Sequence, residues 1–425
     1  MEIFRPINEI QDALVLLTNK LDCMVLFWNP ASGAIETRAA GNVRERVGRL
    51  SDDAFLTAID PGSRALALHL YDGFVKIAPL GGRGELREAF SQRIEEMNIV
   101  DMRFLYGCER PTLAILYADS RENRDTRHLK TYELALGERR HELKRGPLSA
   151  SNIDAGSNMI IPVPFGGCIV LGERIITYFS MAPARNRERR QFHGMADDTS
   201  GAGSSTPDMS LPVSIAVHPA VFRAWGRIDS TRYLLGDHAG RLSMLTLCVD
   251  QGRHHVSDMC VDFLGVTSIA STISYLDNAH AYIGSHLGDS QLVQIVEAPQ
   301  TPDGTKLLVR DTFLNVGPIM DFVVVDFDQR GQGQVVTCSG GYKDGAVHVV
   351  RNGIGISEIS SSKLSGVQGL WSLPACGPSI KTEEEKEEED KFLVLSFVGG
   401  TQVLEMNNNR LDVSAVEIGR ASCRE

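Results

Sequence analysis

The sequence predicts an all-β chain built as a β-propeller. Eight times along its 425 residues an apolar stretch runs into a short polar turn and returns as a second apolar stretch. Most neighbouring turns are about 50 residues apart, which is the length of a propeller blade rather than of a helical repeat. The clearest turns lie near Lys20, Asp72, Ser120, Glu173, His238, His286, Tyr342 and Gly400.

Each turn is flanked by two expected strands. The pairs that read most directly are 13–18 with 23–28, 65–70 with 74–77, 233–235 with 242–247, 281–283 with 291–296, and 335–338 with 346–350. Glycine and aspartate stand in the turns, where the backbone needs a positive φ or a side chain that bonds its own main chain. Many of the strands are almost continuously apolar, which is typical of inner blade strands that are buried on both faces.

The composition limits the classes of protein to which this chain can belong. A hydrophobic fraction of 43% is enough for a large core, and 40 glycines suit a chain rich in turns. The net charge of −11 argues against a nucleic-acid-binding surface over the whole molecule, because such surfaces need clustered lysine and arginine. A short basic patch at residues 185–190 is interrupted by Glu188, and we interpret it as a solvated loop.

The eight cysteines show no CxxC pair and no zinc spacing, and most lie within apolar strands. They are expected to be buried free thiols of a protein in a reducing compartment. The sequence shows no signal peptide and no apolar run of transmembrane length, so we expect no membrane association and a location in the nucleus and cytoplasm.

The motifs that carry chemistry are missing. There is no phosphate-binding loop of the G-x-x-x-x-G-K-[ST] type and no G-x-S-x-G nucleophile elbow. Residues 326–331 have a D-x-D start, but Arg330 stands where a calcium loop needs a third oxygen ligand. We therefore predict a protein that is not an enzyme, with no catalytic residue, no cofactor and no bound metal.

A run of ordered motifs resembles a known family. The stretches are 282–292 (YIGSHLGDSQL), 315–321 (NVGPIMD), 331–334 (GQGQ), 337–340 (TCSG), 351–356 (RNGIGI) and 369–371 (GLW), and further matches precede them in order. Together they are similar to the damaged DNA-binding protein 1 family, the large-subunit adaptors of cullin 4 ubiquitin ligases. The resemblance covers nearly the whole chain except its two insertions and its C-terminal end.

The resemblance implies a domain organisation. Residues 1–366 would be an N-terminal propeller, incomplete at its start, seven-bladed when complete, and interrupted by a flexible insertion at 182–210. Residues 367–416 would begin a second propeller that carries an acidic loop at 381–391, with the boundary around Gly366 to Trp371. Residues 417–425 are expected to be a non-native tail, because they abandon the β pattern. The strand 392–397 is expected to have lost its partners.

The resemblance also implies partners. The chain would be a non-enzymatic scaffold that docks WD-repeat substrate receptors in DNA repair and protein ubiquitination. Cullin 4 would bind through the second propeller, and damaged DNA would be reached only indirectly, through a partner subunit. The alternative is a nucleic-acid-associated propeller subunit of a splicing or pre-mRNA cleavage and polyadenylation complex, since such subunits share the architecture.

The candidate partner-binding residues are Leu287, Pro318, Ile319, Gly341 and Tyr342. They lie in or beside turns of successive modules, so we expect one patch on one face of the disc, with apolar anchors for an interface. The open alternative is that Leu287 and Ile319 cap blade cores; the resemblance favours the interface. The family commonly has Arg at His286 and Ala-Phe at Gly341-Tyr342, so receptor choice is expected to differ.

Overall fold

The computed structural model describes most of the chain, which divides into two compact units. The described residues are 1–45, 48–51, 55–119, 126–136, 142–181, 212–250, 255–297, 304–327, 333–351, 365–374, 390–397, 400–407 and 410–413. The first unit is Met1–Val350 and the second is Arg351–Glu425. The insertion predicted at 182–210 and the tail predicted at 417–425 lie outside the described residues, as does most of the acidic loop predicted at 381–391.

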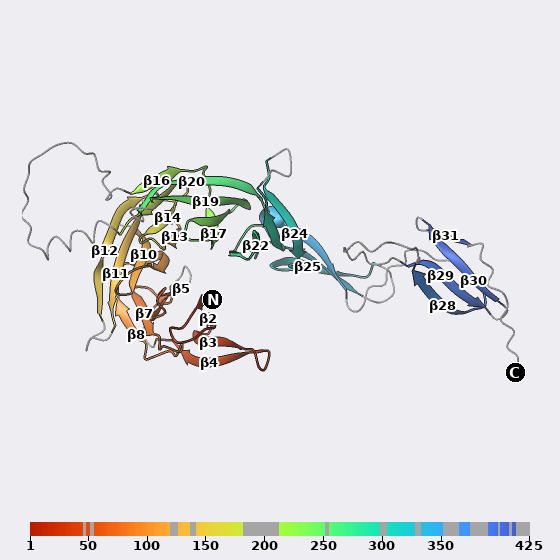
Figure 1. The fold of residues 1–425 in the computed structure, drawn as a ribbon. Helices are drawn as coiled ribbons and strands as arrows, with labels where there is room; N and C mark the ends of the chain where they lie inside the picture. Colours follow the sequence, from red (N-terminus) through yellow and green to blue (C-terminus); the bar gives the residue numbers. More distant parts are fainter. Residues whose placement is uncertain are drawn as a thin grey trace, which may run out of the picture. The chain divides into compact units, whose positions relative to one another are not determined.

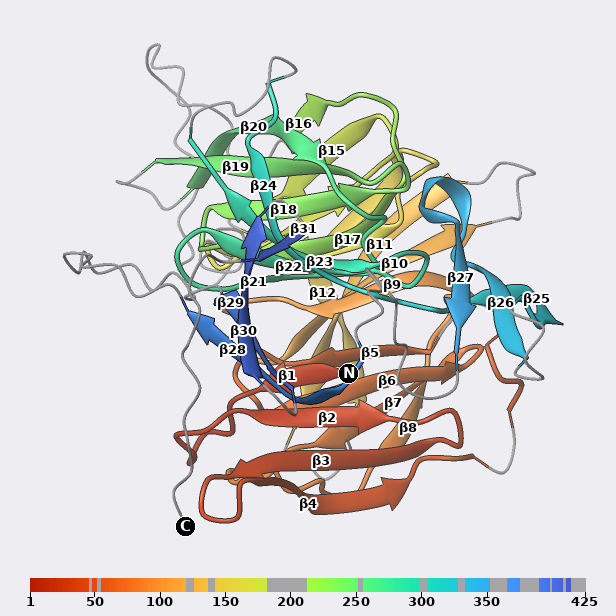
Figure 2. The same cartoon turned by 90° about the vertical axis from the view of Figure 1, so that its right-hand side faces the viewer.

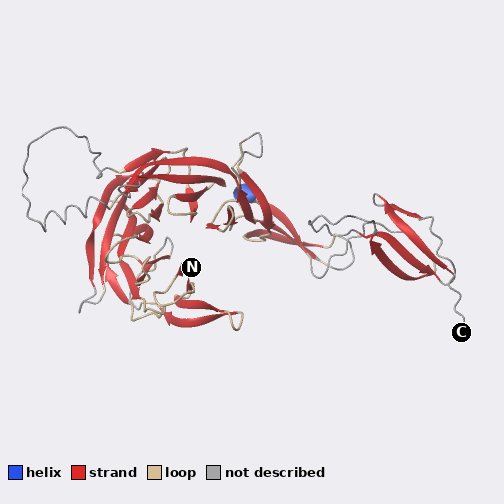
Figure 3. Ribbon diagram, in the orientation of Figure 1, coloured by secondary structure: helices blue, strands red, loops and turns tan. Residues whose placement is uncertain are grey.

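The described residues confirm the prediction of an all-β fold. They form seven four-stranded sheets and one three-stranded sheet, and a single helical turn is the one helical element among them (Figure 3). Neighbouring strands are antiparallel and follow one another in chain order, as Figure 2 shows for the first sheet. Each sheet is therefore a meander, which is the blade of a propeller.

The first three sheets come from the N-terminal part of the chain. The first contains β1 (Glu2–Phe4), β2 (Ala13–Leu17), β3 (Asp22–Asn29) and β4 (Ala34–Asn42). The second contains β5 (Leu56–Ile59), β6 (Ala65–Tyr71), β7 (Phe74–Pro79) and β8 (Phe90–Arg93). The third contains β9 (Asn98–Phe104), β10 (Thr112–Asp119), β11 (Thr126–Ala135) and β12 (Glu142–Ile153).

Four further sheets complete the first unit. The fourth contains β13 (Met159–Pro162), β14 (Cys168–Leu171), β15 (Ile175–Phe179) and β16 (Val213–Ala216). The fifth contains β17 (Phe222–Arg227), β18 (Arg232–Asp237), β19 (Arg241–Asp250) and β20 (His255–Val266). The sixth contains β21 (Thr272–Tyr275), β22 (His280–Gly284), β23 (Ser290–Ile295) and β24 (Leu307–Phe313). The three-stranded seventh sheet contains β25 (Ile319–Val325), β26 (Gln334–Ser339) and β27 (Ala346–Val350).

The eight turns expected from the sequence all join the second and third strands of a sheet, so the predicted hairpins are confirmed. The ends of the observed strands agree with the predicted ones to within a few residues. The sheets of the first unit follow one another along a curve in chain order (Figure 1). First strands of consecutive sheets lie side by side, because β1 contacts β5, β5 contacts β9, β9 contacts β13 and β17 contacts β21.

The core of the first unit consists of layers between consecutive sheets. Strand β6 is buried along its whole length and shows how the layers arise. Its residues Leu66, Leu68 and Leu70 pack toward the first sheet, whereas Ala65 and Ala67 pack toward the third. A strand buried on both faces has no polar face, which explains the continuous apolar runs in the sequence.

The seventh sheet differs from the six before it. Apolar residues of β25 and β27 are exposed, including Phe322, Val323, Val324 and Val347. Among the described residues, none of the buried core layers includes a residue of this sheet. Its link to the sixth sheet is made instead by the loop between β26 and β27.

The second unit holds one described sheet, which corrects one expectation. It contains β28 (Val367–Pro374), β29 (Asp390–Phe397), β30 (Gly400–Asn407) and β31 (Arg410–Val413). The segment expected to have lost its partners lies in β29, which pairs with both β28 and β30. The strands needed to complete this sheet are all local in sequence, so no distant segment is required. The boundary expected around Gly366 to Trp371 stays a prediction, because residues 352–364 are not described.

Candidate partner-binding surface

Four connecting segments meet where the sixth and seventh sheets adjoin, and we call them the junction face. They are residues 267–271 between β20 and β21, 285–289 between β22 and β23, 315–318 between β24 and β25, and 340–345 between β26 and β27. All four lie at the same end of their sheets, because they are either the turn after a second strand or the connection between two sheets.

The 340–345 loop is the centre of the junction face. It contains a single turn of 3-10 helix, Tyr342–Asp344. The Gly340 N–H donates to the Pro318 carbonyl at 2.9 Å, and the Gly341 N–H donates to the Leu287 carbonyl at 3.0 Å. Gly340 has φ +75°, and a Cβ there would meet the main-chain oxygens of Leu287 and Asp344 at 2.5 and 2.6 Å. Only glycine fits this position.

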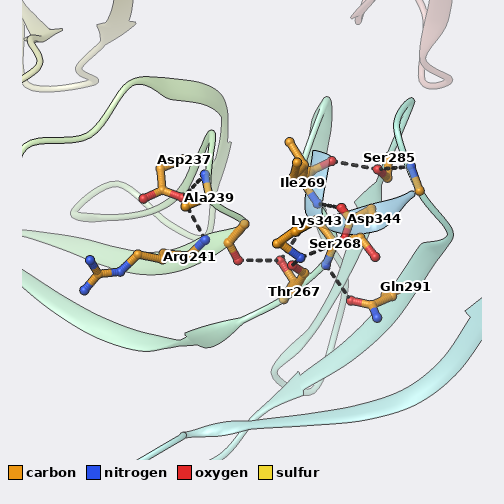
Figure 4. Close-up of polar contacts among 12 residues, drawn as sticks. Asp237, Ala239, Arg241, Thr267, Ser268, Ile269, Ser285, Gln291, Lys343 and Asp344 are labelled. Carbon is orange, nitrogen blue, oxygen red and sulfur yellow. Dashed lines mark hydrogen bonds and ion pairs between the residues drawn. The ribbon is translucent and has the colours of Figure 1, made fainter. Parts of the chain in front are cut away.

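Two charged side chains bind this loop to the 267–271 segment, which connects the fifth and sixth sheets (Figure 4). The Lys343 ammonium donates to the Thr267 carbonyl at 2.7 Å and pairs with the Asp344 carboxylate at 2.7 Å. The other carboxylate oxygen of Asp344 accepts the Ile269 N–H at 2.6 Å. Hydrogen bonds to charged groups are stronger than neutral ones, so this pair holds the loop in one place.

A further set of bonds orders the segments beneath the loop. The Ser285 hydroxyl donates to the Ile269 carbonyl at 2.7 Å, and the Ser268 N–H donates to the Gln291 side chain at 3.0 Å (Figure 4). Next to them, Asp237 closes the β18–β19 turn by accepting the N–H groups of Ala239 and Arg241. The Thr267 N–H donates to the Gly240 carbonyl of this turn at 2.8 Å, so the 267–271 segment has fixed neighbours on both sides.

Asn315 joins the remaining two segments. Its side-chain amide donates to the carbonyls of Ser285 at 3.3 Å, His286 at 3.4 Å and Gly288 at 3.2 Å. Its side-chain oxygen accepts the Gly317 N–H at 3.0 Å. One asparagine thus fixes both the β22–β23 turn and the entry to β25.

The five residues singled out in the sequence come together on this face. Tyr342 is 85% exposed and Ile319 is 52% exposed. Leu287, Pro318 and Gly341 are half-buried. The carbonyls of Leu287 and Pro318 accept main-chain N–H groups of the 340–345 loop, to which Gly341 belongs. None of the five belongs to a buried core layer of the described residues.

Sequence reasoning missed the residues that build the face. Asn315, Lys343 and Asp344 were not predicted as site residues, and neither was the exposed apolar side chain of Met320. The string Asn-Val-Gly-Pro gave a signal for Asn315, because asparagine before a Gly-Pro turn often bonds its own main chain. No feature of the sequence near Lys343 indicates its role, because the carbonyl that accepts its hydrogen bond lies 76 residues away.

The junction face shows apolar and main-chain features rather than reactive groups. Among the described residues, no group of three or more His, Cys, Asp or Glu side chains is placed to hold a metal ion. No described helix is long and apolar enough to cross a membrane. The arrangement can offer a shaped, partly apolar surface to another macromolecule.

Comparison with known proteins identifies the fold family. Residues 1–314 match the model of the RSE1/DDB1/CPSF1 first beta-propeller. The chain belongs to this family. The first-propeller match ends in front of β25, so it covers six of the seven sheets described in the first unit.

Individual relatives match this chain over almost its whole length. DNA damage-binding protein 1 of Oryza sativa subsp. japonica is 42% identical over 98% of the chain. The protein of the same name from Solanum lycopersicum and DNA damage-binding protein 1a of Arabidopsis thaliana are each 41% identical over 98% of the chain. The chain spans 35% of the length of each relative, so it corresponds to about a third of them.

Proposed function

We propose that the chain is a non-enzymatic scaffold propeller of a cullin 4-type ubiquitin ligase adaptor, and that its junction face docks WD-repeat substrate receptors in DNA damage repair. The observation that carries the proposal is the junction face itself. Its segments come from two sheets, are fixed by side-chain bonds to main-chain atoms, and present exposed apolar side chains. A preorganised surface with apolar and aromatic anchors loses little conformational entropy on binding.

The family and its relatives support this proposal. The relatives described above are named DNA damage-binding proteins, and no observation favours a splicing or pre-mRNA cleavage subunit instead. The net charge of −11 suits contact with DNA through a partner subunit better than direct contact. Cullin 4 would bind a region of the longer protein that follows the first propeller, and the complex would act in the nucleus and cytoplasm.

The test is a receptor-binding experiment with the full-length protein carrying Ile319→Asp and Tyr342→Asn. Both side chains are exposed, and Tyr342 has φ +53°, a conformation that asparagine adopts more easily than tyrosine. The variant is expected to fold normally. It should still co-purify with cullin 4 and lose receptor affinity by about tenfold or more, since two apolar anchors are removed.

The matched control is Leu276→Asp. Leu276 is 47% exposed and lies in the β21–β22 turn, at the opposite end of the same sheet from Leu287. This variant should bind receptors like the unaltered protein. Normal receptor binding by the Ile319→Asp, Tyr342→Asn variant, or an equal loss in the Leu276→Asp control, would show that the docking surface lies elsewhere.

A further inference from the structure

A cavity of about 400 Å³ opens among the first strands of five consecutive sheets. We call it the channel pocket. Its walls include Phe4 of β1, Ile59 of β5, Phe104 of β9, Pro162 of β13 and Trp225 of β17. The volume falls in the range of sites that bind small ligands. Such ligands usually bind in concave sites with a few convergent polar groups.

The channel pocket and the junction face lie at opposite ends of the sheets. The pocket's rim includes Ser63 between β5 and β6, Tyr106 between β9 and β10, and Arg227 at the end of β17. These are turns that follow the first strand of a sheet, whereas the junction face uses turns that follow the second. Successive turns of an antiparallel meander lie at opposite ends, so a ligand of the pocket does not compete for the junction face.

The charges that line the pocket are paired, with one exception. The Glu2 carboxylate pairs with Arg103 at 2.9 Å, and the Asp60 carboxylate pairs with Arg64 at 2.6 Å. Arg5 pairs with Asp12 at 2.8 Å. Within the described part of the chain, Arg227 has no carboxylate partner. Its guanidinium donates to the Tyr106 hydroxyl at 3.1 Å and lies 5.9 Å from the centre of that ring.

The pocket also offers a flat apolar wall. The Arg103 guanidinium lies over the indole of Trp225, 6.0 Å from the ring centre. Arg227 follows Trp225 two residues later on the same strand. Trp225 and Arg227 have side chains on the same side of β17, because alternate residues of a strand share a face. An aromatic ring beside an unpaired guanidinium suits a flat ligand that carries an anionic group.

We propose that the channel pocket binds a carboxylate, held by Arg227 and the Tyr106 hydroxyl, with a flat apolar body against Trp225. One unpaired positive charge matches a monoanion. A dianionic phosphate would leave a negative charge close to the carboxylates of Glu2 and Asp60, which disfavours it. The carboxylate can belong to a small organic acid or to an acidic side chain of a peptide, and both present the same group to Arg227.

The test measures binding to the 425-residue chain by saturation-transfer NMR and by intrinsic fluorescence, to which Trp225 contributes as one of three tryptophans. The probes are benzoate, its neutral counterpart benzamide, inorganic phosphate, and a capped hexapeptide containing Phe-Glu together with its Phe-Gln counterpart. Benzoate and the Phe-Glu peptide are expected to bind at least about tenfold more tightly than their amide counterparts, because an arginine–carboxylate bond is lost in the amides. The tighter of the two identifies the source of the carboxylate.

Variants locate the site. Arg227→Gln should reduce carboxylate affinity by about tenfold or more, and Arg227→Lys should retain part of it because the charge remains. Arg232→Gln is the control, since Arg232 already pairs with Asp229 outside the pocket. The proposal fails if carboxylates and amides bind equally, if phosphate binds best, or if Arg227→Gln and Arg227→Lys both bind like the control.

Discussion

Several polar side chains of this protein bond the main chain of turns. Asp229 illustrates this in the β17–β18 turn. One oxygen accepts the N–H groups of Thr231 and Arg232, both at 2.8 Å, and the other accepts the Arg232 guanidinium at 2.7 Å. Partial burial by itself would raise the pKa of Asp229, but these hydrogen bonds outweigh it and lower the pKa from 3.8 to about 2.

Asp229 should therefore contribute stability that depends on pH. Its folded pKa is below the unfolded value, so the contribution is complete above about pH 5 and is lost as the pH falls toward 2. The stability difference between the unaltered chain and Asp229→Asn is expected to narrow over this range in urea titrations. Arg232→Gln should raise the pKa of Asp229 in an NMR titration. A difference that stays constant on acidification would contradict this assignment.

At the scale of the element, the junction face depends on Asn315. Its amide reaches three carbonyls of the β22–β23 turn, and its oxygen holds the entry to β25. Asn315→Ala should lower the free energy of unfolding by about 1–2 kcal/mol, because several hydrogen bonds are lost at a half-buried site.

The control for Asn315→Ala is Gln294→Ala, which removes only the solvent-exposed hydrogen bonds from the Arg310 guanidinium to the Gln294 side-chain oxygen. The free energy of unfolding of Gln294→Ala should be within about 0.5 kcal/mol of that of the unaltered chain. Amide hydrogen exchange should also become faster at residues 285–289 in Asn315→Ala alone. Equal stability of the two variants would show that Asn315 does not hold the turn.

The hairpins could be predicted from the sequence, whereas most of the junction face could not. A hairpin is local, so apolar runs and turn residues a few positions apart are enough to reveal it. The pairs Lys343–Thr267 and Asp344–Ile269 are 76 and 75 residues apart, and their acceptor or donor is a main-chain atom that any residue carries. The five predicted residues were found by their position in turns, which is a local signal too.

The prediction that the strand 392–397 lacks partners was wrong for a related reason. It assumed that the strand needs a distant segment, but β28 and β30 lie next to β29 in the chain and pair with it. A meander supplies its own partners, because each strand pairs with the strand before or after it in the chain. The channel pocket escaped notice because its walls come from five separate sheets.

At the scale of the whole molecule, stability is distributed unevenly among the sheets. The second to fifth sheets have apolar layers on both sides, as the continuous burial of β6 shows. The seventh sheet contributes no residue to these layers and keeps Phe322, Val324 and Val347 exposed. Its position depends on the hydrogen bonds of the 340–345 loop rather than on burial.

Hydrogen exchange of the 425-residue chain should reveal this gradient. Amides of β6, β10 and β18 are expected to exchange slowest, through global unfolding, because they lie in strands buried on both faces. Amides of β25 and β27 should exchange faster by at least about tenfold, through local opening. Equal protection of β6 and β25 in mass-spectrometric exchange would mean that the seventh sheet is packed in solution.

The anchors of the junction face have an evolutionary consequence. Lys343 bonds the carbonyl of residue 267, and Asn315 bonds the carbonyls of residues 285, 286 and 288. A carbonyl is present whatever side chain its residue carries, so substitutions at these positions leave the bonds available. The outward side chains can then differ between related proteins without loss of these loop-fixing bonds. Under the docking role proposed above, such differences would change which receptor binds while the loops keep their geometry.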